Sequence, residues 1–157
     1  MFTLFDYSFR PEHIPATEAL AWAAAAETIC TDEYLLHPDP HPSRQAWCQE
    51  RCRYTLTRLN TLPPETPLIL INHWPLRADL AYLPRIPRFS LWCGTHHTED
   101  WHTYFNVQAV VYGHLHIRGT YWRDGVRCEE VSFGYPKQWN PQVGLRGYLR
   151  QILPVPS

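Results

Sequence analysis

The sequence lacks the features of a membrane or nucleic-acid-binding protein. No apolar stretch reaches the ~20 residues that a transmembrane helix needs, and no signal peptide is recognisable at the start. No run of Lys and Arg stands out, and the net charge is −1 at pH 7. A large nucleic-acid footprint needs a basic surface, so these absences argue against one. We therefore expect a cytoplasmic protein that has neither nucleic acid nor a membrane as a partner.

The cysteines do not form a recognisable framework for disulfides or zinc. Their number, five, is odd, and no pair has the C-x₂-C spacing of a zinc site. Reduced thiols in the cytosol are the favoured interpretation. Cys48 and Cys52 lie four residues apart on a probable helix, which leaves a metal clip as a weaker alternative to two buried thiols.

The composition is that of an ordinary globular domain. The chain has 157 residues, 45% of them hydrophobic and 14% aromatic, which is enough to build a hydrophobic core. No repeat, linker or low-complexity tract divides it, so we expect a single domain, or part of one, over residues 1–157.

Apolar runs alternate with stripes of helical spacing, which favours a mixed α/β architecture with helices covering one sheet. Strands are predicted near 68–72, 89–93, 108–113, 118–123 and 126–132, and helices near 16–30 and 43–61.

A tight hairpin is predicted at Asp124-Gly125, because this pair lies between two alternating runs. The alternation predicts that Tyr121 and Val131 face the core, and that Arg123 and Glu129 face water.

Histidines follow two of the predicted strands at the point where each strand ends. His73 comes after the run 67–72, and His114 and His116 come after the run 108–112 and Gly113. In extended backbone, residues i and i+2 point to one face, so these two side chains would converge while Leu115 faces the core. Ligands gather beyond the carboxyl ends of strands in open α/β sheets. Neutral imidazoles suit a borderline metal ion, and we predict a metal site at these three histidines.

Two sequence blocks, Asn72-His73 and Gly113-His114-Leu115-His116, resemble the last two blocks of the calcineurin-like metallophosphoesterase family. The segment from Phe89 to Trp139 further resembles one bacterial subgroup of these enzymes. The family pattern begins with D-x-H, G-D and G-N-H-E/D blocks, none of which occurs between Met1 and Ile71. The chain therefore resembles only the C-terminal half of the family domain.

The resemblance implies the C-terminal half of the metallophosphatase α/β-sandwich, a mixed β-sheet flanked by helices. It implies hydrolysis of a small phosphate mono- or diester at two divalent ions (Mn, Fe or Zn) in the complete domain. His73 and His114 would bind the second ion and His116 the first. The family's catalytic histidine lies in a missing block, so no catalytic residue is assigned. The positions that the resemblance places near the substrate are Asp6, Tyr7, Asn72 and Trp92.

Two hypotheses follow for the chain as given. In the first, it is a phosphoesterase half, produced by a misplaced start codon, a truncated gene or a deliberate fragment. Such a half would be inactive, because two close divalent cations need anionic ligands between them, and its uncovered sheet edge would favour self-association. In the second, it is a non-catalytic chain that binds at most one Zn²⁺ or serves as an interaction module.

Overall fold

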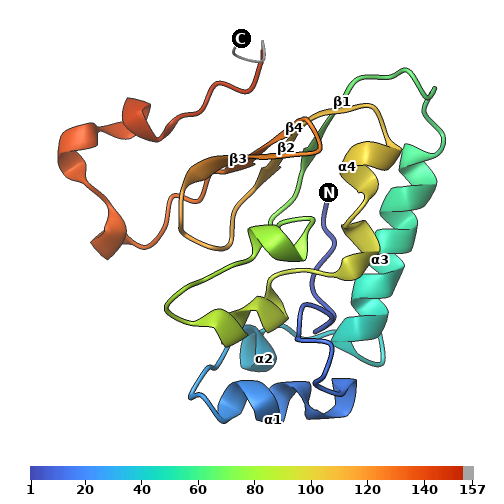
Figure 1. Ribbon diagram of the computed structural model, residues 1–157, viewed down its shortest axis with the longest axis vertical. Helices are drawn as coiled ribbons and strands as arrows, with labels where there is room; N and C mark the ends of the chain where they lie inside the picture. The colour runs from blue at the N-terminus through green and yellow to red at the C-terminus, as the bar shows by residue number, and fades with distance from the viewer. Residues whose placement is uncertain (154–157) are drawn as a thin grey trace.

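A four-stranded mixed sheet lies at one end of the structure, a computed structural model in which residues 1–153 are described (Figure 1). The strands are β1 (Leu68–Ile71), β2 (Val107–Tyr112), β3 (Gly119–Arg123) and β4 (Val126–Glu130), in the spatial order β1-β2-β4-β3. β1 and β2 are parallel, as are β2 and β4, whereas β3 and β4 are antiparallel. The predicted mixed α/β fold is confirmed.

The strand predicted near 89–93 is wrong, because this segment is the 3₁₀ helix Pro87–Trp92. Pro87 occupies its first position, where the fixed φ of proline suits a helix start. Leu91 and Trp92 are buried. A short apolar run has the same appearance in a buried strand and in a buried helical turn, and here the helical turn is formed.

The longest helix is α3 (Arg44–Leu59), close to the predicted 43–61. Ser43 Oγ accepts a hydrogen bond of 3.1 Å from the Ala46 amide and so caps its N-terminus. The remaining elements are α1 (Ala19–Ala24), α2 (Asp32–Leu35), α4 (Trp101–Tyr104) and the 3₁₀ helices Ala16–Glu18, Ala78–Leu80, His96–Thr98, Pro136–Gln138, Pro141–Val143 and Leu145–Tyr148.

The helix predicted near 16–30 is shorter than expected, since α1 ends at Ala24. Glu27 has a left-handed backbone, with φ 53°. The Thr28 amide bonds the Ala23 carbonyl and the Glu27 amide bonds the Ala24 carbonyl. These are the two bonds of a Schellman helix end. Glycine usually occupies the left-handed position at a helix end. Because Glu27 occupies it here, the sequence gives no signal that the helix ends at this point.

The N-terminal segment is part of the core. Figure 1 shows it running between α3 and the loops that follow β1. Thr3, Leu4 and Phe5 are buried, and the Phe5 ring packs edge-on to Trp74 at 6.1 Å between centroids. The sheet end and α3 are therefore joined through these first residues.

The hairpin at Asp124-Gly125 is present, and both residues have the positive φ, 51° and 78°, that a type I′ turn requires. Tyr121 packs against the core as predicted. The prediction that Glu129 faces water is wrong, because its residue is only 3% exposed. β4 is an inner strand, and Thr120 Oγ1 donates to both Glu129 carboxylate oxygens at 3.0 and 3.1 Å.

After β4 the chain leaves the body of the molecule as an arm, defined here as residues 131–153 and drawn in red in Figure 1. The arm forms a loop between Val131 and Tyr148, and Arg118 binds both ends of this loop. Its guanidinium donates hydrogen bonds to the carbonyls of Val131 and Ser132 at one end and to the Tyr148 carbonyl at the other. Arg127 donates to the carbonyls of Gln151 and Ile152.

All five cysteines are buried and unpaired, in agreement with the expected thiols. Among the described residues, no helix has the length and apolar character to cross a membrane.

Candidate functional site

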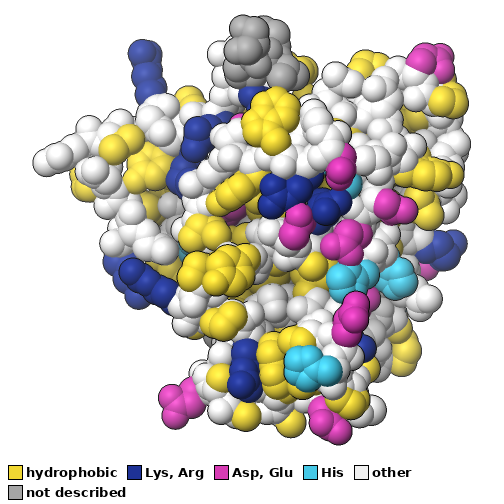
Figure 2. All heavy atoms as spheres, in the orientation of Figure 1, with side chains coloured by type: hydrophobic (Ala, Val, Ile, Leu, Met, Phe, Trp, Pro, Cys, Tyr) yellow, Lys and Arg dark blue, Asp and Glu magenta, His cyan; other side chains and the backbone are white. Residues whose placement is uncertain are grey.

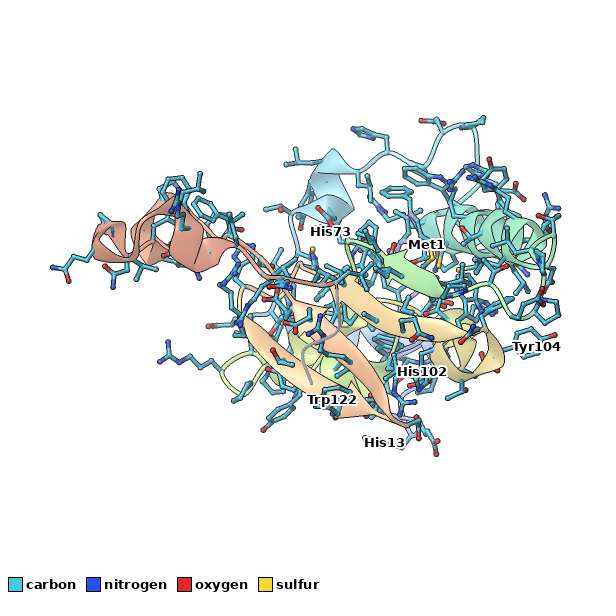
Figure 3. All side chains as sticks on the ribbon, turned by 90° about the horizontal axis from the view of Figure 1, so that it is seen from above. Met1, His13, His73, His102, Tyr104 and Trp122 are labelled. Atoms are coloured by element: carbon cyan, nitrogen blue, oxygen red, sulfur yellow. The ribbon has the colours of Figure 1, made fainter. Side chains whose placement is uncertain are left out.

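His73 and His114 meet at the carboxyl end of the sheet. Because β1 and β2 are parallel neighbours, their carboxyl ends lie together. The Gly113 amide donates to the His73 carbonyl at 3.0 Å and holds the two strand ends in register. His73 Nε2 lies 3.1 Å from His114 Nδ1. Figure 3 shows His73 at the end of β1, far from His13. Two of the three predicted ligands are thus brought into direct contact.

His116 lies beside this pair, but not for the reason that the sequence suggested. The backbone is not extended here, because His114 and His116 have left-handed φ values of 72° and 57°. Non-glycine residues seldom adopt this conformation, and two so close together mark a constrained segment. Leu115 is buried, as predicted. The His116 ring packs edge-on to Tyr135, with 4.7 Å between centroids.

The three histidines lie between two hollows of the surface. The first, of about 450 Å³, is also lined by Asp32, Phe89 and Tyr135. The second, of about 350 Å³, is also lined by Asn72 and Ser132. Both volumes fall within the range of small-molecule sites.

The environment favours the neutral imidazoles of His73 and His114 at physiological pH. Burial, together with the nearby His73 and His116, lowers the pKa of His114 from 6.5 to about 4. Burial also lowers the pKa of His73, although the negative charge of Asp32 opposes this. Neutral imidazoles have a free lone pair for a metal or a proton. Within residues 1–153, the buried His114 Nε2 has no hydrogen-bond partner.

The donor set fits only part of a metal centre. Across the described residues, no group of three His, Cys, Asp or Glu side chains is arranged to hold an ion. A zinc site needs at least three protein ligands, and a two-metal centre needs bridging anions. Asp32, which the sequence did not single out, lines the same hollow as the histidines. These side chains alone do not form the two-metal centre.

Tyr7 and Trp92, predicted to lie near the substrate, meet at a half-buried acid, Glu33. Glu33 Oε1 accepts two hydrogen bonds, one of 2.8 Å from the Tyr7 hydroxyl and one of 2.6 Å from Trp92 Nε1. Arg44 pairs with the same carboxylate at 3.3 Å. Burial and the Glu33 bond raise the pKa of Tyr7. Neither Tyr7 nor Trp92 lines the histidine hollows. Glu33 was not identified from the sequence, because no local pattern links it to Tyr7, 26 positions before it, or to Trp92, 59 positions after it.

Asn72 and Asp6 hold loops in place. The buried Asn72 amide donates to Thr3 Oγ1 at 2.6 Å and to the Trp74 carbonyl at 2.9 Å, and Asn72 also lines the second hollow. Asp6 accepts from the Ser8 amide and from Thr95 Oγ1. Of the four predicted substrate-proximal residues, only Asn72 lines one of the two hollows beside the histidines.

The chain is similar to a mycobacterial hydrolase. It is 49% identical over 158 residues to the [acyl-carrier-protein] phosphodiesterase PptH of Mycobacterium tuberculosis (strain ATCC 25618 / H37Rv), a match that covers 100% of this chain and 48% of that protein. The crystal structure of the phosphopantetheinyl hydrolase PptH from Mycobacterium tuberculosis superimposes with a TM-score of 0.92 at 49% identity, over 99% of this chain and 55% of that one. No protein-family model matches. The chain spans about half the length of the relatives it matches.

Proposed function

We propose that this chain supplies about half of a phosphodiesterase that releases phosphopantetheine from an acyl carrier protein. The observation that carries the proposal is the 49% identity to PptH over the whole chain, at a TM-score of 0.92. The three histidines at the strand ends support it, because they give this half a set of donors suited to phosphoester chemistry. The proposed substrate is a protein-bound phosphodiester, in place of the small ester expected from the sequence.

In this proposal His73, His114 and His116 contribute imidazole ligands to a divalent centre whose other ligands come from outside this chain. A divalent ion held there would supply Lewis-acid chemistry to the phosphodiester. The chain's own contribution is to favour the neutral imidazoles of His73 and His114, with the pKa of His114 lowered to about 4. Phe89 stacks on His114 with 5.7 Å between ring centroids, and Tyr135 packs edge-on to His116, which restricts both imidazole rings.

The resemblance to the calcineurin-like metallophosphoesterases stays a prediction, and it agrees with this assignment. Its first three blocks, absent here, carry the bridging carboxylate. We therefore expect residues 1–157 alone to have little or no activity.

The test compares residues 1–157 with the same chain extended by the in-frame sequence that precedes it in the gene. Each is supplied with Mn²⁺, Fe²⁺ or Zn²⁺ and with a holo-acyl carrier protein, and mass spectrometry follows the loss of phosphopantetheine. The extended form should convert the carrier. His114→Ala should lower its rate by at least about 100-fold, as expected for loss of a metal ligand. His13→Ala, an exposed histidine far from the site, is the matched control.

Metal-dependent turnover by residues 1–157 that disappears in His114→Ala would contradict the incomplete centre. Inactivity of both forms would favour the second hypothesis, a non-catalytic chain that binds one zinc ion or serves as an interaction module.

A further inference from the structure

The arm, residues 131–153, carries positive charges and no negative ones. Lys137, Arg146 and Arg150 are exposed, and this segment contains no Asp or Glu. Within residues 1–153 their side chains make no ion pair or hydrogen bond, whereas Arg44, Arg77 and Arg123 elsewhere are paired with acids. In Figure 2, dark-blue and yellow side chains occur without magenta ones where the arm stands out at the upper left. An anionic partner would complement this charge.

The arm also exposes large apolar side chains. Leu145 and Leu149 are 71% and 68% exposed, and Trp139 is 41% exposed. Apolar side chains gathered on one segment, with charges around them, have the make-up of a protein-binding surface. Three cations among apolar residues are too few for a nucleic-acid site that relies on phosphate neutralisation.

The arm begins at the histidine site and is fixed to the sheet. Tyr135 packs on His116, and Gln138 lines the same hollow. The Arg118 guanidinium binds the backbone at both ends of the loop and lies 5.3 Å from the Tyr148 ring centroid. A protein bound to the arm would therefore lie beside the mouth of the hollow.

We propose that the arm is the docking surface for the carrier protein, through an acidic surface next to the carrier's phosphopantetheine group. Lys137, Arg146 and Arg150 would attract the acidic surface, and Trp139, Leu145 and Leu149 would contact its apolar residues. The phosphodiester would then reach the hollow at His73 and His114. This inference rests on the proposed function, because it takes the carrier protein as the substrate.

The test measures binding by isothermal titration calorimetry, with no turnover needed. The chain of residues 1–157 is titrated with holo-acyl carrier protein, with the apo form, and with poly-L-glutamate. The charge variant is Lys137→Glu with Arg146→Glu and Arg150→Glu. The matched control is Arg53→Glu with Arg58→Glu, two exposed cations on α3, across the molecule from the arm. A further variant, Leu145→Ser with Leu149→Ser, removes apolar contacts and keeps the charges.

We expect the chain to bind both carrier forms with an affinity that falls as salt rises. The charge variant should weaken binding by at least about tenfold, whereas the α3 control should change it by less than about twofold. The serine variant should also weaken it. The inference is overturned if the unsubstituted chain does not bind, if the two charge variants weaken binding equally, or if poly-L-glutamate binds as tightly as the carrier.

The outcome is separate from that of the proposed function. If the arm binds the carrier and the extended protein releases no phosphopantetheine, docking stands and the hydrolase assignment fails. If the extended protein with the arm charges reversed still releases phosphopantetheine at the unchanged rate and KM, the assignment stands and docking fails.

Discussion

The Tyr7 hydroxyl donates a 2.8 Å hydrogen bond to Glu33 Oε1, which joins the N-terminal segment to α2. The same carboxylate oxygen accepts from Trp92 in the 3₁₀ helix that replaces a predicted strand. Three segments far apart in the sequence thus converge on one acid. Because α2 also carries Asp32, which lines the histidine hollow, this acid helps to position one wall of the site.

Glu33→Ala should lower the free energy of unfolding by about 2–3 kcal/mol, since it leaves the Tyr7 hydroxyl and the Trp92 indole N–H buried without a partner. Urea denaturation followed by tryptophan fluorescence measures this. Glu50→Ala is the control, because the Glu50–Arg53 pair is exposed on α3 and should contribute less than about 1 kcal/mol. If both variants lose the same free energy of unfolding, the hydrogen bonds of Glu33 contribute no more to stability than an exposed ion pair.

The stability of the metal-free chain should fall as the pH is lowered from 6.5 towards 4. The folded chain holds the pKa of His114 at about 4, against 6.5 in the unfolded chain. In this window the unfolded chain therefore binds the extra proton and is favoured. The contribution of neutral His114 to the free energy of unfolding is complete above pH 6.5. It is lost as the pH falls from 6.5 to the pKa of His114 in the folded chain, about 4. Between pH 7 and pH 5 we expect a loss of about 1–2 kcal/mol, allowing for partial exposure of the ring.

Urea denaturation at each pH, repeated with His114→Gln, measures this dependence. The glutamine variant should be less sensitive to pH in the same window. If it loses as much stability as the unsubstituted chain, then other groups cause the dependence.

The metal prediction can be tested directly on residues 1–157. Two adjacent imidazoles and a third nearby should bind one Zn²⁺ weakly, because the described donors do not form a complete set. Calorimetric titration at pH 7.5 should give at most one ion per chain. His114→Ala should reduce the affinity by about tenfold or more, and His13→Ala should leave it unchanged. Tight binding of two ions would show that this chain alone holds a complete centre.

The sheet and hairpin could be predicted because their signals are local. The apolar runs that become β1 and β2 alternate with helical stripes, and Asp124-Gly125 selects a turn with two positive φ values. The segment 87–92 misled because its apolar residues suit a strand or a buried helical turn equally. The burial of Glu129 depends on partners, above all Thr120, that only the folded sheet supplies.

The meeting of His73 and His114 could be predicted from the sequence, but the backbone geometry around it could not. Two strand ends followed by histidine indicated where His73 and His114 would meet. The left-handed backbone of His114 and His116 has no sequence signal, since neither is glycine. Asp32 and Tyr135 reach the site through the placement of α2 and the arm, which depends on contacts such as Tyr7–Glu33 and Arg118–Val131.

The outer edge of β1 should make residues 1–157 self-associate. Within the described residues β1 pairs with no strand other than β2; at its outer edge the Met1 ammonium donates to the Ile71 carbonyl at 2.6 Å, and Ile71 is 59% exposed. A hollow of about 450 Å³ between this edge and α3 is lined by Tyr54 and Leu62. An open, apolar edge strand is a template for another strand. Sedimentation velocity over a concentration series should therefore show dimers or larger species.

Ile71→Lys should shift this equilibrium towards monomer by at least about tenfold, because a charge at a sheet edge opposes strand pairing. Ile29→Lys is the matched control, since Ile29 is 64% exposed but lies outside the sheet, after α1. A chain that stays monomeric at every concentration would show that Arg51 and Arg58, which also line the hollow, already protect the edge by their charge. If both lysine variants dissociate the chain equally, the contact lies elsewhere or is a general effect of added charge.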